Sequence, residues 1–369
     1  MKKKSFLTIF IMLLIMLLIL YPNLCLKAAQ DGLLLWFNKV LPSLLPFIIF
    51  INLLVPLDGL KGLIKLASPL SQKIWHLPGY SFFAFLIGLI ASYPMGAKTV
   101  KNLYQDGKLN KQDAEITLCF CNNCGPLFII ATVGSAMFGS TSLGYFLLFI
   151  HIFSALLLSL FVTRSHQSTI VTDTYLTSNS TTCPSFTTIL NNGVMNAMDT
   201  ILCVGGYIIL FSVMLTLLTK TPFLTSLTSH LIKSPNATTY INGIVAVLLE
   251  VSNGAHALSK FTPPSIYSIA LVSSAIGFGG LCVYFQTLYV LENKLPTTCY
   301  FISKCVQGII SFALTLFFYP FYIMYTQKTI LYFKSIWLLI GLILLISSYL
   351  ILHYTLHKNT SAHSTCSFS

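Results

Sequence analysis

Two polar, helix-breaking sequences interrupt the apolar runs of this chain. One is Ser-Tyr-Pro-Met-Gly-Ala-Lys at residues 92–98, and the other is Cys-Asn-Asn-Cys-Gly-Pro at residues 121–126. Lipid offers no hydrogen-bond partners, so broken backbone at membrane depth is stable only where protein covers it or where it lines a water-filled cavity. These two sequences therefore predict a polar binding site inside a membrane protein.

The composition agrees with a chain that lies mostly in lipid. Hydrophobic residues make up 55% and charged residues 8% of the 369 residues, and the mean hydropathy is +0.81. A soluble domain carries roughly 25% charged residues. We therefore predict an all-α polytopic membrane protein in the cell membrane. The net charge of +12 comes from Lys and Arg between apolar runs, and no basic face with interleaved aromatics indicates nucleic acid.

The N-terminus has a basic start followed by an apolar run at residues 6–20. A signal peptide has the same beginning, but Leu26-Lys27-Ala28 is a poor small-x-small cleavage site. We expect an uncleaved helix with its N-terminus inside. Further apolar segments predict crossings at residues 33–57, 143–162, 191–218, 265–291, 298–325 and 330–354. A cytoplasmic loop is expected where Lys61, Lys65, Lys73 and His76 follow one another.

Two further segments do not fit simple, unbroken crossings. The apolar run at residues 80–91 ends in the 92–98 sequence, and basic residues follow at once (Lys98, Lys101, Lys108 and Lys111). A crossing there would place these lysines outside, so we expect a re-entrant hairpin with its tip at residues 93–96. Residues 113–138 predict a crossing made of two half-helices joined at residues 122–126.

The second half of the chain resembles the first. Residues 88–97 match residues 246–255, with Gly96 on Gly254, and residues 121–126 match residues 273–278, with Gly125 on Gly277. Counting crossings makes the two units inverted repeats, and paired broken segments in such repeats mark the binding site of secondary transporters. We predict a first repeat at 33–163, a Ser/Thr-rich linker at 164–188, a second repeat at 189–326, and terminal helices within 1–32 and 327–369.

The candidate site residues follow from these breaks. Glu250 lies in an apolar run, where an acid usually faces a cavity or a partner, although an acid near the membrane surface is the alternative. Ser252 and Asn253 follow it directly. Asp199 is a second candidate, with a solvated acid at a helix end as its alternative. Ser92 and Tyr93 would line the cavity, and Lys98 would pair with a carboxylate or anchor the hairpin at the interface.

The break at residues 122–126 offers both donors and acceptors. Asn122, Asn123 and the backbone at Gly125 are candidate ligands, and a half-helix that begins at about Pro126 would point free N–H groups at the cavity. Such a site favours an anion. The alternative is a plain kink whose polar groups are satisfied by neighbouring helices.

The sequence contains no pattern typical of an enzyme. It lacks a Gly-x-Ser-x-Gly elbow, a Walker loop, a dinucleotide fingerprint and an H-E-x-x-H motif. Cys119, Cys121 and Cys124 form a C-x-C-x-x-C cluster, but a metal would need a fourth ligand. We therefore expect no catalytic residues, no metal and no cofactor.

At these motifs the chain resembles the YlbJ-type family of sporulation integral membrane proteins. The residues that carry the resemblance are Tyr-Pro-Met-Gly-Ala-Lys at 93–98, Asp-Gly-Lys-Leu at 106–109, the 120–130 segment and Leu-Glu-Val-Ser-Asn-Gly at 249–254. The resemblance covers about residues 33–325, and Cys124 stands where the family usually has a small residue. It implies two nucleoside-recognition (Gate) domains, expression in an endospore-forming bacterium, and movement of dipicolinate from the mother cell toward the forespore.

We therefore expect a transporter-like carrier of a small polar, anionic metabolite that uses H⁺ or Na⁺ as coupling ion. Its partners would be membrane lipid and the small-molecule substrate. The resemblance implies a mother-cell or outer forespore membrane, and dipicolinate as substrate. The alternative is a non-transporting membrane protein needed for assembly of the spore envelope or cortex.

Overall fold

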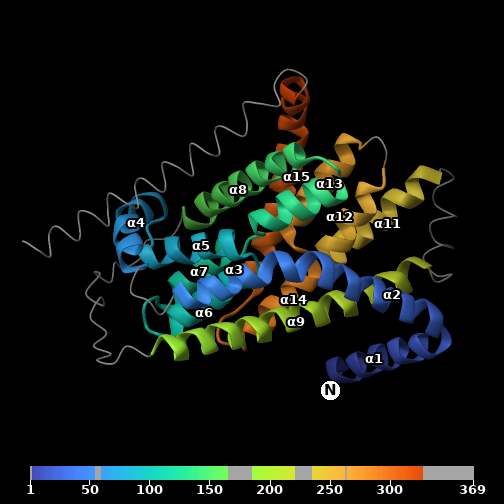
Figure 1. Ribbon diagram of the computed structural model, residues 1–369, viewed down its shortest axis with the longest axis horizontal. Coiled ribbons are helices and arrows are strands. Elements are labelled where there is room, and N and C mark those ends of the chain that lie inside the picture. Colours follow the sequence, from blue (N-terminus) through green and yellow to red (C-terminus); the bar gives the residue numbers. More distant parts are fainter. Residues whose placement is uncertain (1, 55–59, 165–184, 221–234, 262–263, 327–369) are drawn as a thin grey trace, which may run out of the picture. The chain divides into compact units, whose positions relative to one another are not determined.

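The computed structural model describes residues 2–54, 60–164, 185–220, 235–261 and 264–326 (Figure 1). Every regular element in these ranges is a helix, and five helices are long and apolar enough to cross a membrane, or up to six if one bent pair is a single span. The predicted all-α polytopic membrane protein is thus confirmed. Most of the 164–188 linker and the 330–354 helix lie outside the described residues. Contacts divide the chain into Met1–Phe318 and Tyr319–Ser369.

The N-terminal helices begin earlier than the sequence predicts. After α1 (Lys2–Leu20), a continuous helical stretch consists of α2 (Pro22–Leu35), a π-helical stretch η1 (Trp36–Val40) and α3 (Leu41–Leu54), and its part Pro22–Leu53 is long and apolar enough to cross a membrane. Proline is tolerated in a first helical turn, which explains the start at Pro22. The widened π turn precedes Pro42, whose ring would clash with a carbonyl of a regular helix.

The loop predicted at residues 61–76 is wrong, because this segment forms the helix α4 (Leu60–Trp75). Ile64 and Trp75 are buried on one side, whereas Lys65 and Lys73 are exposed on the other. The charges that indicated a loop therefore belong to the solvent face of an amphipathic helix. The end of α4 meets α5 (Gly79–Ala91) at a bend of 95°.

A helical hairpin follows where the first break was predicted. Its arms are α5 and α6 (Met95–Gln105), and they meet at residues 92–94, which we call the first tip. Ser92 takes a positive φ of 68°, which is uncommon for a residue other than glycine. The chain continues through α7 (Lys111–Cys121), an irregular break at residues 122–125, the π-helix η2 (Phe128–Met137) and α8 (Thr141–Thr163).

The second half of the chain is also helical. Its described helices are α9 (Phe186–Lys220), α11 (Pro235–Leu249), α12 (Val251–Ser259), α13 (Ile266–Phe278), α14 (Gly280–Leu291) and α15 (Thr298–Thr326). Helices α11 and α12 meet at Glu250, and we call residues 250–253, this break and the first turn of α12, the second tip. The break predicted at residues 273–278 is shifted: Gly277 lies within α13, and the chain turns at Gly279 and Gly280, with φ of 85° and 77°.

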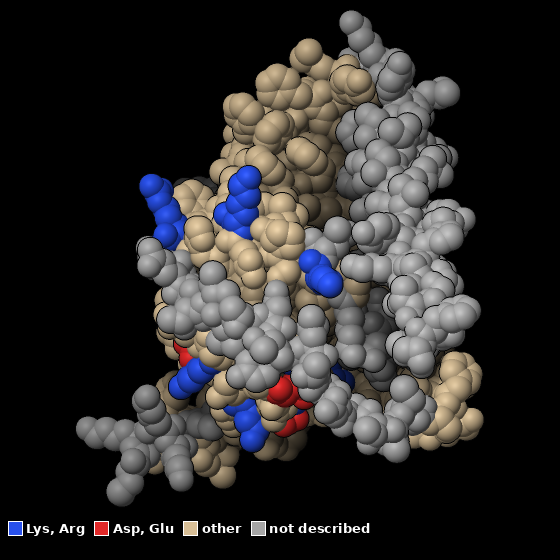
Figure 2. Space-filling view, turned by 90° about the vertical axis from the view of Figure 1, so that its left-hand side faces the viewer, with Lys and Arg blue, Asp and Glu red and all other residues tan. Residues whose placement is uncertain are grey.

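The two hairpins approach from opposite ends of the larger unit. In Figure 1, α5, α6 and α7 lie toward the left and α11 and α12 toward the right. Lys and Arg side chains gather on the left-hand face, as Figure 2 shows, together with a few acidic ones. By the positive-inside rule we expect this face to lie toward the cytoplasm.

Glycines let the first hairpin lie directly on the break after α7. A Cβ at Gly88, in α5, would overlap the carbonyl oxygen of Cys121, and a Cβ at Gly96, in α6, would meet the same oxygen. Both arms therefore contact a single peptide group at the end of α7. An aromatic cluster supports this packing, since the Trp75 ring lies 5.3 Å from Phe85 and 4.9 Å from Phe120.

An ion pair connects the first hairpin to the loop after α14. Lys101 of α6 donates to Glu292 Oε1 at 2.9 Å, and the hydrogen bond to Lys101 holds the pKa of the exposed Glu292 below its usual value. A carboxyl with a lowered pKa adds stability above its unfolded pKa and loses that contribution as pH falls through its folded pKa. Acidification from about pH 7 to about pH 4 should therefore lower the thermal midpoint of the wild type more than that of Glu292→Gln.

This pH effect should also shrink in high salt, because the carboxylate is exposed to screening ions. Asp106→Gln provides the matched control. Its pair with Lys108 lies at the surface and connects no distant segments, so this variant should keep the acid sensitivity of the wild type. Equal acid sensitivity of the wild type and Glu292→Gln would contradict the prediction.

Candidate functional site

The two tips line one small cavity. Ser92 and Tyr93 come from the first tip and Glu250 and Ser252 from the second, while most other lining side chains are aliphatic or aromatic. The cavity has a volume of about 20 Å³, enough for one water molecule or an ion of similar size. Residues that lie more than 150 positions apart in the sequence therefore share one polar space.

Glu250 is the charged residue of this cavity wall, and it also begins a helix. Its side chain is 2% exposed, and its carboxylate accepts hydrogen bonds from the backbone N–H groups of Ser252 at 2.9 Å and Asn253 at 2.6 Å. It is thus the N-cap of α12, where the helix dipole favours a negative charge. The side chain of Asn253 turns away and donates to Ser212 Oγ at 2.8 Å.

Two buried polar atoms in the cavity wall have no hydrogen-bond partner among the described residues. They are Tyr93 Oη and Gln286 Oε1, on side chains that are 7% and 3% exposed. A buried polar group without a partner costs about 1–3 kcal/mol. Atoms of this kind beside a carboxylate suit a small polar occupant, such as water or a cation.

The break after α7 joins the two halves of the chain. Asn122 Nδ2 donates to Thr287 Oγ1 at 2.9 Å and to Tyr300 Oη at 2.8 Å, and both acceptors belong to the second half. Asn122 Oδ1 accepts from the backbone N–H of Ala97 at 3.4 Å, next to the first tip. The predicted pair Asn122 and Asn123 is fully buried at this point.

Lys304 is a buried residue at this break that the sequence analysis did not single out. It lies in α15 and is 2% exposed, and its Nζ donates to the Asn122 carbonyl oxygen at 2.8 Å and to Gln307 Oε1 at 2.5 Å. Gln307 in turn donates to Asn123 Oδ1 at 3.2 Å. A lone lysine in an apolar run is a signal of function, and this signal was present within the predicted 298–325 crossing.

The remaining predicted residues lie at different distances from this centre. Gly125 packs against Ser92, so the break touches the first tip. Lys98 is half-buried and donates to Thr200 Oγ1 at 3.1 Å, and Asp199 is exposed on α9. The structure therefore brings together Ser92, Tyr93, Glu250 and Ser252, places the asparagines behind them, and leaves Lys98 and Asp199 outside the cavity.

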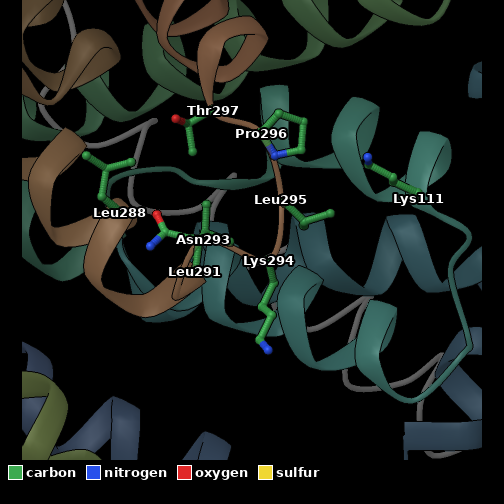
Figure 3. A pocket seen from close by; sticks show the side chains of 8 residues that line it. All are labelled: Lys111, Leu288, Leu291, Asn293, Lys294, Leu295, Pro296 and Thr297. Atoms are coloured by element: carbon green, nitrogen blue, oxygen red, sulfur yellow. The ribbon is translucent and has the colours of Figure 1, made fainter.

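A larger hollow opens at the surface and belongs to other residues. It measures about 420 Å³ and lies between the α14–α15 loop and the start of α7, where Lys111 stands on one side and Asn293 and Lys294 on the other (Figure 3). None of the predicted site residues lines it. Its size alone does not make it the better candidate, because its polar groups are exposed to solvent rather than buried.

One curated protein is similar to this chain over most of its length. It is the sporulation integral membrane protein YlbJ of Bacillus subtilis (strain 168), which is 28% identical over 311 residues that cover 78% of this chain and 76% of the relative. This similarity supports a YlbJ-type assignment. No family model and no solved structure matches the chain, so its two Gate domains stay a prediction from the resemblance.

Proposed function

We propose that this chain is a membrane carrier of a small polar, anionic metabolite. The observation that supports the proposal most is the cavity shared by the two tips, with the buried Glu250 in its wall. Broken helices that meet at one polar site are the common plan of secondary transporters. In such a plan, the two hairpins open the site alternately to the two sides of the membrane.

The proposed setting is endospore formation, because the YlbJ relative is named as a sporulation protein. We propose dipicolinate as the metabolite, on the family resemblance, and a mother-cell or outer forespore membrane as its place. Glu250 would hold the coupling ion, H⁺ or Na⁺, since a buried carboxylate without a cationic partner suits a small cation better than an anion.

Uptake into proteoliposomes tests this function. Vesicles with the purified chain are given labelled dipicolinate or labelled uridine under an imposed H⁺ or Na⁺ gradient, and empty vesicles provide the background. We expect saturable dipicolinate uptake that depends on one of the two gradients. Saturable uptake of uridine alone would reject dipicolinate as the substrate and keep the carrier function. Uptake of neither compound by monodisperse protein would reject the carrier function.

The alternative function is assembly of the spore envelope or cortex without transport. It is favoured by the surface hollow, whose two lysines could contact another molecule. In that case Lys111→Glu with Lys294→Glu should stop spore maturation, whereas Glu250→Gln should not. The carrier predicts the reverse result.

A further inference from the structure

The buried amine of Lys304 has no acidic partner. Among the described residues, no Asp or Glu oxygen lies within ion-pair distance of its Nζ, and its hydrogen-bond acceptors are a backbone carbonyl and an amide oxygen. The other buried lysine, Lys101, is paired with Glu292. A buried ammonium group without an acidic partner is costly. No ion pair among the described residues compensates this cost at Lys304.

The hydrogen bonds of Lys304 use only two of the donors of its ammonium group. An ammonium group has three donors, and two of them reach Asn122 and Gln307. The bond to the Asn122 carbonyl compensates the end of α7, where the helix dipole amounts to about half a negative charge. One donor of the ammonium group therefore remains for another acceptor.

A second donor without an acceptor contacts the same break. His151, in α8, is 1% exposed, and its Nε2 accepts from the backbone N–H of Cys124 at 3.0 Å. That bond places the proton of the neutral ring on Nδ1, and Nδ1 has no partner among the described residues. The side chains of Lys304 and His151 both contact residues 122–124, and each has a donor without an acceptor.

The break lies next to the proposed transport cavity. Gly125 packs against Ser92, and Ala97 donates to the side chain of Asn122. The cavity itself is lined by Glu250 and by no Lys or Arg of the described residues. An anionic substrate needs a positive group, and of the two buried lysines among the described residues, the one without an acidic partner, Lys304, contacts the break.

We propose that Lys304 binds a carboxylate group of the carried metabolite at the break of residues 122–124, with His151 Nδ1 as an additional donor. The ligand class is a small carboxylate, held by charge-assisted hydrogen bonds. This inference rests on the carrier proposal, which leaves the anion-binding residue open. It divides the labour at the site, with Glu250 for the coupling cation and Lys304 for the anion.

Binding of a matched probe pair tests Lys304 separately from transport. The probes are dipicolinate and its neutral analogue of the same shape, pyridine-2,6-dicarboxamide, titrated against the purified full chain. We expect the wild type to prefer the dicarboxylate by at least about tenfold, the value of one hydrogen bond to a charged group. Lys304→Gln should remove this preference by weakening dicarboxylate binding alone, and Lys304→Arg should keep most of it.

The control is Lys108→Gln, which removes one positive charge at the surface and should leave the preference unchanged. An equal preference in Lys304→Gln and the wild type overturns the role of Lys304. A wild type that binds both probes equally, or neither, overturns the carboxylate site without any variant, even if Lys304→Gln fails to fold. If the wild type takes up dipicolinate and Lys304→Gln still prefers the dicarboxylate over the dicarboxamide, the carrier function is supported and the role of Lys304 is refuted.

Discussion

Glu250→Gln should reduce dipicolinate uptake by about 100-fold while the protein stays folded. Glutamine has the same shape, and its one carbonyl oxygen can still accept one of the two N–H bonds that Glu250 takes from Ser252 and Asn253. What disappears is the negative charge at the cavity wall. If the coupling cation loses a charge-assisted contact, the cost is about 3 kcal/mol, or roughly 100-fold. The measurement is initial uptake rate in proteoliposomes at equal protein density.

Glu115→Gln is the matched control, because Glu115 lies on α7 and is only partly buried. Its uptake should equal that of the wild type. A Glu250→Asp variant adds a second test, since it keeps the charge but shortens the side chain and should recover part of the rate. Full uptake by Glu250→Gln would remove Glu250 from the transport path.

Gly88→Ala should destabilise the protein by at least about 3 kcal/mol, at the upper end of the cost of overpacking. The added Cβ overlaps the Cys121 carbonyl oxygen, which is backbone and cannot rotate away. The hairpin would have to leave the break, and the aromatic contacts of Phe85 would loosen with it. Thermal unfolding in detergent, followed by size-exclusion chromatography, measures the loss.

Gly206→Ala is the comparison, since a Cβ at Gly206 meets nothing within 4 Å and the residue lies inside α9. Alanine is the better helix former by about 1 kcal/mol, so this variant should be neutral or slightly more stable. Similar midpoints for Gly88→Ala and Gly206→Ala would show that the hairpin does not depend on close contact with the break.

The sequence predicts the broken elements well, because glycine, proline and asparagine in an apolar run leave few alternatives. The turn at residues 92–94 and the break between α11 and α12 at Glu250 both lie where polar or helix-breaking residues interrupt hydrophobic segments. The second break shows the limit of the pattern. The match of Gly277 to Gly125 predicts the break too early. The chain turns instead at Gly279 and Gly280, because two adjacent glycines adopt positive φ without steric cost.

Packing between distant segments could not be predicted in the same way. The charges of Lys65 and Lys73 indicate a loop unless the 3.6-residue period of α4 is considered with them. Lys304 lies in a long apolar run, and its partner Asn122 becomes a neighbour only when α15 lies against the α7 break. Single-residue signals of this kind need the tertiary structure to acquire a meaning.

The two amide hydrogens of Asn122 have a mechanical consequence. Both are donated to residues of α14 and α15, so the end of α7 is fastened to helices of the other half of the chain. A rocking motion that separated the halves at the linker would break both bonds, although Asn122 and Thr287 are fully buried. The moving bodies of the proposed carrier should therefore cut across the sequence, with the end of α7 moving together with α14 and α15.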